Sequence, residues 1–287
     1  MLERTAYPAG VPCWVDTTQP DVAAAVDFYS RLFGWQFEDA QPPDAPGRYV
    51  VGHLRGRRVA AVGSTDQARQ QAAVWNTYVC VESADDTAAQ VVAAGGEMRM
   101  PPMDVGQAGR TAVLADPGGA VLHLWQPGTT IGAQLVNEPG TWNWSDLNTR
   151  DVARAKTFYG QIFGWQADKV DFGSGESYMW RMPGYGDFLE QLNPGVRQAH
   201  RDAGAPEGFT DAIGWLLHMS NDQFAADASP HWAVTFSVDD TDQIADRAQK
   251  LGGTITVAPF DVPYARMAVI TDPQGAVFSI SKYNPPT

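Results

Sequence analysis

The sequence predicts an α+β protein built from four copies of one βαβββ module, which form two tandem domains. Three observations carry this prediction. The chain has 287 residues, which is enough for two domains at roughly 100–200 residues each. Two long segments of its first half recur in its second half. Each half also repeats the order of its own strand and helix signals.

The first recurring segment is a helix with its capping residues. Residues 21–36 match residues 151–166 at an offset of 130, with ten of sixteen positions identical. Asp21 can accept hydrogen bonds from the free amides that begin a helix. Gly34 ends the helix, because glycine readily adopts positive φ. The apolar residues of one helical face lie between them, at Val22, Val26, Tyr29 and Phe33.

The second recurring segment is a turn that leads into an alternating strand. Asp-Pro-Gly-Gly at residues 116–119 matches Asp-Pro-Gln-Gly at residues 272–275, and Trp75 matches Trp232 at an offset of 157. The offsets of 130 and 157 differ by 27 residues, so the second half carries a net insertion of that length. We place it in the Gly-, Pro- and Asp-rich stretch 183–212, as a lid over a site in the second half, an interface loop or a disordered excursion.

The chain divides into a first domain at residues 1–128, a linker at residues 129–139 and a second domain at residues 140–287. The linker is polar, contains glycine and has no periodicity. Within the first domain, the pattern of a strand, a helix and further strands occurs twice. The first module has strands near 13–16, 49–54 and 58–62 around its helix, and the second has strands near 75–81, 111–114 and 121–125 around a helix at 86–94.

The composition limits the partners and the compartment. Acidic residues outnumber basic residues by 33 to 20, and a net charge of −13 repels phosphate backbones, so we expect no nucleic-acid partner. No apolar run approaches the roughly eighteen residues of a membrane span. Cys13 and Cys80 are too few for a disulfide framework or a cysteine-rich zinc site. Because the start of the sequence lacks a signal-peptide core, we expect a cytoplasmic protein, either a monomer or a homodimer.

The recurring residues resemble those of a known module. Phe-Tyr at 28–29 and Phe-Gly-Trp at 33–35, with their copies and the two Asp-Pro-x-Gly turns, are similar to the βαβββ module of the vicinal oxygen chelate superfamily. Glyoxalase I, extradiol dioxygenases and bleomycin-resistance proteins are members. The resemblance covers residues 11–127 and 138–283, and the Trp-x-Asp strand starts are similar to a two-domain actinobacterial group of glyoxalase-like proteins. It implies two tandem glyoxalase/bleomycin-resistance-type domains, whose paired modules cup around two pockets per chain.

The resemblance also implies where a metal ion would bind. Metal-dependent members place His, Gln or Glu on the first and last strands of their modules. A divalent ion needs three or more such ligands, and these positions offer one imidazole in this chain. We therefore expect no catalytic metal and no other cofactor. The corresponding positions are Trp14, Asn76 and His123 in the first half and Trp144, Ala233 and Ser279 in the second.

Strand alternation predicts which side chains share each pocket, because residues two apart face the same side of a sheet. Aromatic rings beside a few polar groups are typical of a binding site for a flat, partly polar small molecule. The first pocket is expected to contain Trp14, Asp16, Asn76, Tyr78, His123 and Trp125, and the second Trp144, Asp146, Thr235, Ser279 and Ser281.

Asp16 and His123 are the candidate catalytic residues. A carboxylate beside the imidazole would orient it and raise its pKa, which would form an acid–base pair. Alternatively, each group makes only a local hydrogen bond. Ser279 is the counterpart of His123, so we expect proton-transfer chemistry in the first pocket and binding alone in the second. The other residues assigned to the pockets are expected to contact the small molecule.

Four functions remain open. The first is a metal-free protein that binds an aromatic or carbonyl-containing metabolite, in the manner of drug-resistance members of the superfamily. The second is a lyase- or hydroxylase-like enzyme that uses acid–base groups in the same pockets. The third is a metal-dependent glyoxalase-type lyase or dioxygenase, which the residues at the ligand positions disfavour. The fourth is an interaction module whose pockets are vestigial. No residue pattern separates the first function from the second.

Overall fold

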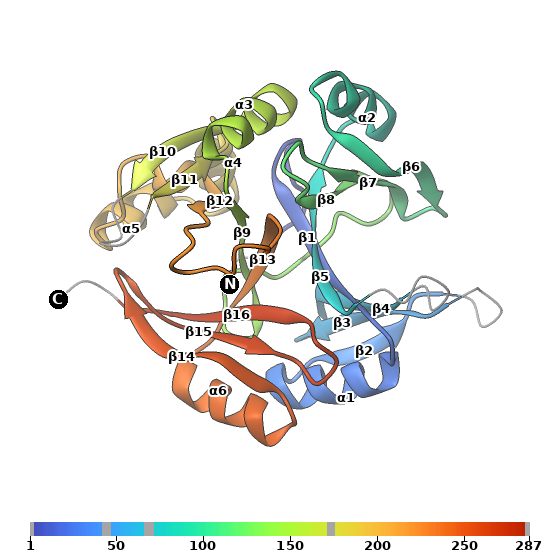
Figure 1. Cartoon of the computed structure of the whole chain (residues 1–287), viewed down its shortest axis with the longest axis vertical. Coiled ribbons are helices and arrows are strands. Elements are labelled where there is room, and N and C mark those ends of the chain that lie inside the picture. The colour runs from blue at the N-terminus through green and yellow to red at the C-terminus, as the bar shows by residue number, and fades with distance from the viewer. Residues whose placement is uncertain (1–2, 42–46, 66–71, 171–175, 285–287) are drawn as a thin grey trace.

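The first half of the chain folds into one eight-stranded sheet made by two modules. The structure is a computed structural model that describes residues 3–41, 47–65, 72–170 and 176–284 (Figure 1). The first module contains β1 (Pro12–Gln19), α1 (Val22–Phe33), β2 (Gln36–Asp39), β3 (Tyr49–Leu54) and β4 (Arg57–Ser64). The second contains β5 (Val74–Cys80), α2 (Ala84–Ala93), β6 (Glu97–Val105), β7 (Gly109–Ala115) and β8 (Val121–Pro127).

The second half forms a matching eight-stranded sheet. Its first module contains β9 (Thr141–Thr149), α3 (Val152–Phe163), β10 (Gln166–Val170), β11 (Ser177–Arg181) and β12 (Ala212–His218). Its second module contains β13 (His231–Ser237), α6 (Thr241–Lys250), β14 (Thr254–Val262), β15 (Ala265–Thr271) and β16 (Val277–Tyr283). The α+β architecture of four modules is therefore confirmed.

The two sheets have the same strand order. It is β2-β3-β4-β1-β5-β8-β7-β6 in the first half and β10-β11-β12-β9-β13-β16-β15-β14 in the second. In every module the first strand pairs in parallel with the last one. The first strands of the two modules in each half pair antiparallel, β1 with β5 and β9 with β13. This central pairing places the opening strands of both modules in the middle of the sheet.

The helix boundaries follow from their capping residues. The Asp21 carboxylate accepts a backbone hydrogen bond at the start of α1, and Gly34 ends the helix with a φ of 77°. α3 has equivalent caps. α2 begins two residues before the predicted range 86–94, because the Ser83 hydroxyl accepts the N–H of Asp86. Among the described residues, no helix is long and apolar enough to cross a membrane.

The second half contains two extra helices between β11 and β12. In the first half a tight turn at Arg55 and Gly56 connects the equivalent strands β3 and β4. The extra segment forms α4 (Tyr185–Leu192), α5 (Val196–Asp202) and the 3-10 turn η2 (Phe209–Asp211). Tyr185 is buried, and Arg4 donates a hydrogen bond of 3.4 Å to its hydroxyl. α4 therefore packs against the N-terminal segment of the chain.

A pair of hydrogen bonds joins the halves and uses both recurring motifs. The Tyr29 hydroxyl of α1 donates to Asp272 Oδ2 at 2.8 Å, and the Tyr159 hydroxyl of α3 donates to Asp116 Oδ2 at 3.0 Å. The other oxygen of each aspartate accepts two backbone N–H groups and closes the Asp-Pro-x-Gly turn. As a result, α1 lies beside α6 and α2 lies beside α3 (Figure 1).

Buried tryptophans surround these hydrogen bonds. Trp75 and Trp232 donate their indole N–H groups to the two tyrosine hydroxyls, each at 3.1 Å. Trp35 and Trp165 donate to backbone carbonyls of the opposite half, at 2.7 and 2.6 Å. All four indoles are buried. The apolar rings lower the local dielectric, so a broken hydrogen bond at this interface is expensive.

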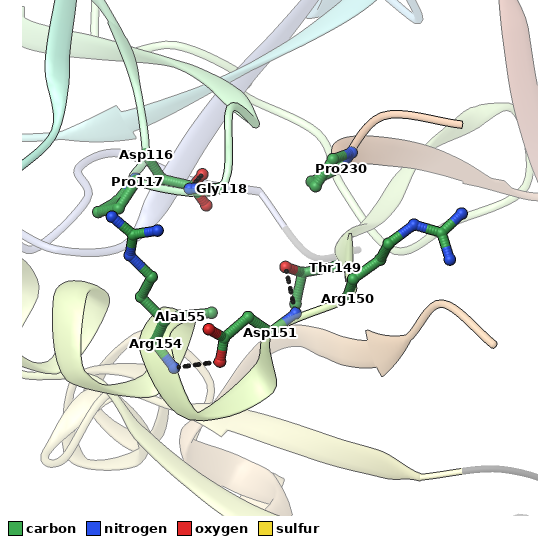
Figure 2. Close-up of a pocket in the computed structure, with 9 residues that line it drawn as sticks. All are labelled: Asp116, Pro117, Gly118, Thr149, Arg150, Asp151, Arg154, Ala155 and Pro230. Carbon is green, nitrogen blue, oxygen red and sulfur yellow. Dashed lines mark hydrogen bonds between the residues drawn. The ribbon is translucent and has the colours of Figure 1, made fainter. Parts of the chain in front are cut away.

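The two sides of this interface differ in the donors to their turn aspartates. Asp272 Oδ2 also accepts from Gln19 Nε2 at 2.7 Å. Thr149 holds the position of Gln19 on the other side, and its short side chain makes no hydrogen bond to Asp116. A cavity of about 220 Å³ lies there, bordered by both of these residues (Figure 2). Tyr159 is therefore the one side chain, among the described residues, that donates to Asp116.

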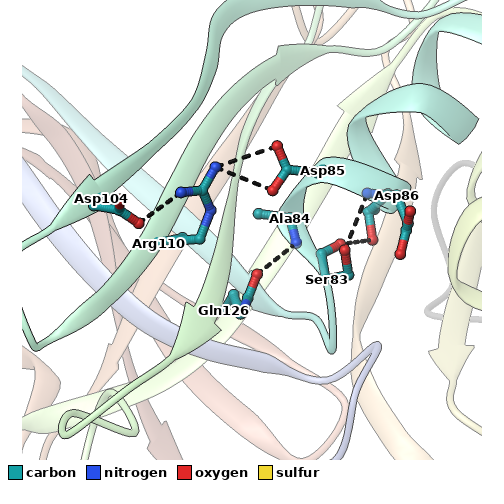
Figure 3. A network of polar contacts seen from close by, with 8 residues as sticks. Ser83, Ala84, Asp85, Asp86, Asp104, Arg110 and Gln126 are labelled. Carbon is teal, nitrogen blue, oxygen red and sulfur yellow. Dashed lines mark hydrogen bonds and ion pairs between the residues drawn. The ribbon is translucent and has the colours of Figure 1, made fainter.

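A surface network of ion pairs fastens α2 to its sheet (Figure 3). Arg110 of β7 lies 2.6 Å from Asp104 Oδ1 and 3.0 Å from Asp85 Oδ2. Such exposed pairs contribute about 0–1 kcal/mol each, so they orient α2 on the sheet more than they stabilise the fold. The second half repeats the arrangement with Arg266, Asp242 and Asp261.

We expect Tyr159→Phe to lower the free energy of unfolding by about 1–3 kcal/mol, because the buried Asp116 carboxylate loses its side-chain donor. Tyr29→Phe is expected to cost less, since Gln19 still donates to Asp272. Urea unfolding followed by tryptophan fluorescence measures both effects. Equal losses in the two variants would contradict this account of the interface.

Candidate functional site

The structure brings most of the predicted first-pocket residues together on one face of the first sheet. Asp16 on β1 lies opposite Asn76 on β5, and Trp14 lies opposite Tyr78. Tyr78 in turn pairs with His123 on β8, and their ring centroids are 4.4 Å apart. We call this surface the first face. Asp16 is buried at its base with 3% of its surface exposed, and the other polar side chains are half-buried.

Three side chains donate hydrogen bonds to the Asp16 carboxylate. The Asn76 amide donates to Oδ1 at 2.8 Å, and the hydroxyls of Tyr78 and Tyr49 donate to Oδ2 at 2.7 and 3.0 Å. Burial, followed by the Asp16 charge, raises the pKa of both tyrosines, so both remain protonated donors at neutral pH. The chain itself therefore satisfies the carboxylate of Asp16.

Tyr49 is a site residue that the sequence analysis missed. Its hydroxyl also accepts a hydrogen bond of 3.0 Å from Trp14 Nε1, so it connects Trp14 to Asp16. The residue lies on β3, two strands away from β1 in the sheet. The alternation of β3 places Tyr49 and Val51 on one face, but only the register with β4 shows that this face is the one that carries Asp16.

The imidazole of His123 is not among the donors to Asp16. Burial lowers the pKa of His123, and the nearby Asp16 charge opposes this effect without overcoming it. The expected rise in the pKa of the imidazole is therefore wrong, because desolvation outweighs the carboxylate. His123 is neutral at pH 7 and can accept a proton.

Trp125 lies apart from the hydrogen-bonded cluster of the first face. It pairs with Cys80, two residues further along the strands than the pair of Tyr78 and His123. Its indole is buried and donates to the Thr130 carbonyl at 2.8 Å. In this structure Trp125 anchors the chain segment that follows β8.

The second sheet carries an equivalent surface, which we call the second face. Thr235 on β13 lies opposite both Trp144 and Ser279. Trp144 makes edge-to-face contacts with Trp215 of β12 and Phe209 of η2, at centroid distances of 5.8 and 5.9 Å. The sequence analysis did not assign the latter two aromatic residues. Ser281, assigned to this pocket, is buried opposite Ser237.

Asp146 occupies the position of Asp16 on the second face, but most of its donors are missing. The register places Ser177, Ala233 and Thr235 where the first half has Tyr49, Asn76 and Tyr78. Of these, only Thr235 donates, to Oδ2 at 3.3 Å. Asp146 Oδ1 is buried without a hydrogen-bond partner. Burial raises the pKa of Asp146 to about 7, and hydrogen bonds from the Thr235 side chain and the Trp215 backbone oppose the rise.

The side chains at the family's ligand positions do not fit a metal ion. The indole of Trp14 and the amide nitrogen of Asn76 are engaged as donors to Tyr49 and Asp16. In the described part of the chain, no three His, Cys, Asp or Glu side chains converge as metal ligands would. We therefore derive no chemical step through a metal.

Two sheets of this topology, each with aromatic and polar side chains on one face, define a tandem glyoxalase-type protein. The chain belongs to the Glyoxalase/Bleomycin resistance protein/Dioxygenase superfamily, whose family model matches residues 14–124 and 141–280. It is 35% identical over 291 residues to the Mycobacterium tuberculosis protein CFP32, whose name classes it as a glyoxylase; 99% of each chain is covered. It is 33% identical to the anthracycline biosynthesis protein DauV of Streptomyces sp., with 96% of this chain and 94% of DauV covered.

Solved structures share the fold at much lower identity. The Mn(II)-bound glyoxalase from Novosphingobium aromaticivorans matches with a TM-score of 0.59 and 14% identity, covering 96% of this chain and 82% of its own. The 2,3-dioxygenase LapB from Pseudomonas sp. matches with a TM-score of 0.60 and 12% identity, covering 97% and 95%. At these identities the likeness shows the fold alone.

The two aspartates are expected to respond oppositely to an amide substitution. With a pKa near 7 against an ordinary 3.8, Asp146 binds a proton in the folded state between these pH values and not in the unfolded state. Stability is therefore lost as the pH rises through this window, by at most about 4 kcal/mol. Asp146→Asn removes this loss, so its stability relative to the parent should rise between pH 4 and pH 8.

Asp16→Asn is the matched control. An amide turns one acceptor oxygen of a fully satisfied group into a donor, which is expected to cost about 1–3 kcal/mol. Urea unfolding of the parent and both variants at pH 4, 6 and 8 gives the comparison. A stability difference between Asp146→Asn and the parent that stays constant with pH would refute the raised pKa.

Proposed function

We propose that the chain binds a flat, partly polar small molecule, aromatic or carbonyl-containing, on the faces of its two sheets without a tightly bound metal. The observation that carries this proposal is the gathering of aromatic and polar side chains on one face of each sheet, at the positions of the family's metal ligands. Such a surface suits stacking and a few directed hydrogen bonds.

The relatives support the same class of molecule. DauV and a second relative are named for anthracycline biosynthesis, and CFP32 is named as a glyoxylase. An anthracycline contains a flat, hydroxylated, carbonyl-bearing ring system, and a glyoxalase acts on a small carbonyl compound. Both fit a face that combines indole rings with hydroxyl, amide and carboxyl groups.

A metal-free enzyme is the second candidate function, and His123 favours it. Its imidazole is neutral and half-buried beside Tyr78, so it can take a proton from a bound hydroxyl or carbon acid. Asp16 contributes a negative charge and positions Tyr78 through their hydrogen bond. In this proposal His123 is the catalytic base of the first face, and Trp14 and Asn76 contact the substrate.

We expect aromatic hydroxyl or carbonyl compounds to raise the melting temperature of the purified protein, and zinc, manganese or nickel ions to leave it unchanged. A ligand at one hundred times its Kd stabilises the folded state by about 2.7 kcal/mol, which a thermal-shift assay detects easily. Elemental analysis should find far less than one transition metal per chain. About one equivalent, lost in His123→Ala, would overturn the metal-free proposal. A chain that responds to neither class of ligand would contradict the proposed binding function.

If a compound is turned over, His123→Ala is expected to lower kcat by roughly a hundred- to ten-thousand-fold, because a positioned base is lost. Ser279→Ala on the second face should leave kcat largely intact. The opposite result, loss with Ser279→Ala and not with His123→Ala, would move the chemistry to the second face.

A further inference from the structure

The second face lacks the side chains that, on the first face, donate hydrogen bonds to the carboxylate. Around Asp16, two tyrosine hydroxyls and one amide complete the carboxylate. Around Asp146, the equivalent positions carry Ser, Ala and Thr, and Ser279 replaces the His123 ring. Thr235 in particular has no ring where Tyr78 has one. The second face therefore has smaller side chains at the positions that satisfy the carboxylate in the first half.

The missing donors leave a buried acceptor unsatisfied. Asp146 is 8% exposed, and its Oδ1 has no partner among the described residues. A buried polar group without a hydrogen bond costs about 1–3 kcal/mol. Protonation of the carboxyl group removes its charge but supplies no partner. A hydrogen-bond donor from outside the chain would supply one.

The first half also indicates which donor fits. Tyr78 lies opposite Trp14 and donates to Asp16 through a phenol hydroxyl at 2.7 Å. On the second face the equivalent residue is Thr235, which has a short side chain. Trp144 and Trp215 provide half-buried indole rings nearby. An aromatic ring that carries a hydroxyl group would stack on these indoles and direct its hydroxyl to Asp146.

We infer that the second face binds a phenol-like ligand, an aromatic ring with a hydroxyl group that donates to Asp146 while the ring packs against Trp144 and Trp215. This inference rests on the proposed function and names the ligand class for one of the two faces. Asp146 is then the residue that selects hydroxylated rings over rings that cannot donate.

The 3-10 turn η2 of the extra segment lies against this proposed site. Asp146 Oδ1 is inaccessible in the structure, and Phe209 of η2 packs edge-to-face on Trp144. A ring that stacks on Trp144 would displace Phe209, which belongs to a short 3-10 turn and not to the sheet. Of the roles expected for the insertion, this arrangement favours the lid.

The test compares 2-naphthol with 2-methoxynaphthalene by isothermal titration calorimetry. The two rings match in shape and carry an oxygen, but only 2-naphthol can donate a hydrogen bond. We expect 2-naphthol to bind roughly 10- to 100-fold more tightly, as a hydrogen bond to a charged or buried acceptor provides. Asp146→Leu keeps a similar volume without an acceptor, so it should abolish this preference and leave binding of 2-methoxynaphthalene in place.

Thr235→Tyr provides a second, independent variant. It places a phenol on β13 where the first half has Tyr78, so it should satisfy Asp146 from within the chain and block 2-naphthol on the second face. Arg110→Gln, which alters only the surface ion pairs with Asp85 and Asp104 in the first half, is the control for handling and should keep the full preference.

The outcomes separate the two proposals. Equal binding of both compounds by the parent, or a preference that survives in Asp146→Leu, would overturn the role of Asp146 and leave the proposed function standing. Failure of both compounds to bind would overturn the proposed function and this inference with it. If Thr235→Tyr does not fold, the comparison of the parent with Asp146→Leu still decides the question.

Discussion

The hydrogen bond from a helix tyrosine to the turn aspartate of the opposite half is the interaction on which the arrangement of the two halves depends. Each aspartate uses one oxygen to close its own Asp-Pro-x-Gly turn and the other to accept Tyr29 or Tyr159. One buried carboxylate therefore fixes a local turn and the position of a helix from the other half. Because its donors come from both halves, neither half can shift without leaving a buried charge unpaired. The residues that recur most clearly in the sequence are thus those that hold the halves together.

This constraint fixes the scaffold and leaves the two faces free to differ. The tyrosine–aspartate hydrogen bonds join helices to turns, whereas Asp16 and Asp146 lie on the central strands β1 and β9. At the same register, one carboxylate has three side-chain donors and the other has one. Such a difference does not come from the backbone, because both sheets share their strand order. It comes from a few side chains on β3, β5 and their counterparts.

The sequence was sufficient to predict the fold and the residues on each face, but not the hydrogen bonds that the carboxylates accept. Repeats predicted the four modules, and strand parity grouped Asp16, Asn76, Tyr78 and His123, which lie together in the structure. Parity within one strand says nothing about partners on a strand that is distant in the sequence, so it could not reveal that Tyr49 completes Asp16. For the same reason it left open whether Asp16 pairs with His123 or hydrogen-bonds a neighbour, and the structure shows three other side chains as donors to the carboxylate. The contact of Phe209 with Trp144 depends on the path of an insertion that has no counterpart in the first half.

A carboxylate without its full set of hydrogen bonds gains more free energy from a bound ligand than a satisfied one does. A saturated group such as Asp16 gains little from a ligand, since any new hydrogen bond must replace one that the chain already makes. Asp146 Oδ1 has no hydrogen-bond partner among the described residues. A ligand donor that reaches this oxygen therefore removes the free-energy cost of leaving it unsatisfied. In the proposed enzyme, the neutral imidazole of His123 would make the first face the place for proton transfer, and the unsatisfied oxygen of Asp146 would make the second face the place for selective binding. Locally unfavourable features, such as a buried polar atom without a hydrogen-bond partner, concentrate at functional sites. With such a ligand bound, the duplicated scaffold would carry one carboxylate satisfied by its own side chains and one satisfied by a molecule from outside.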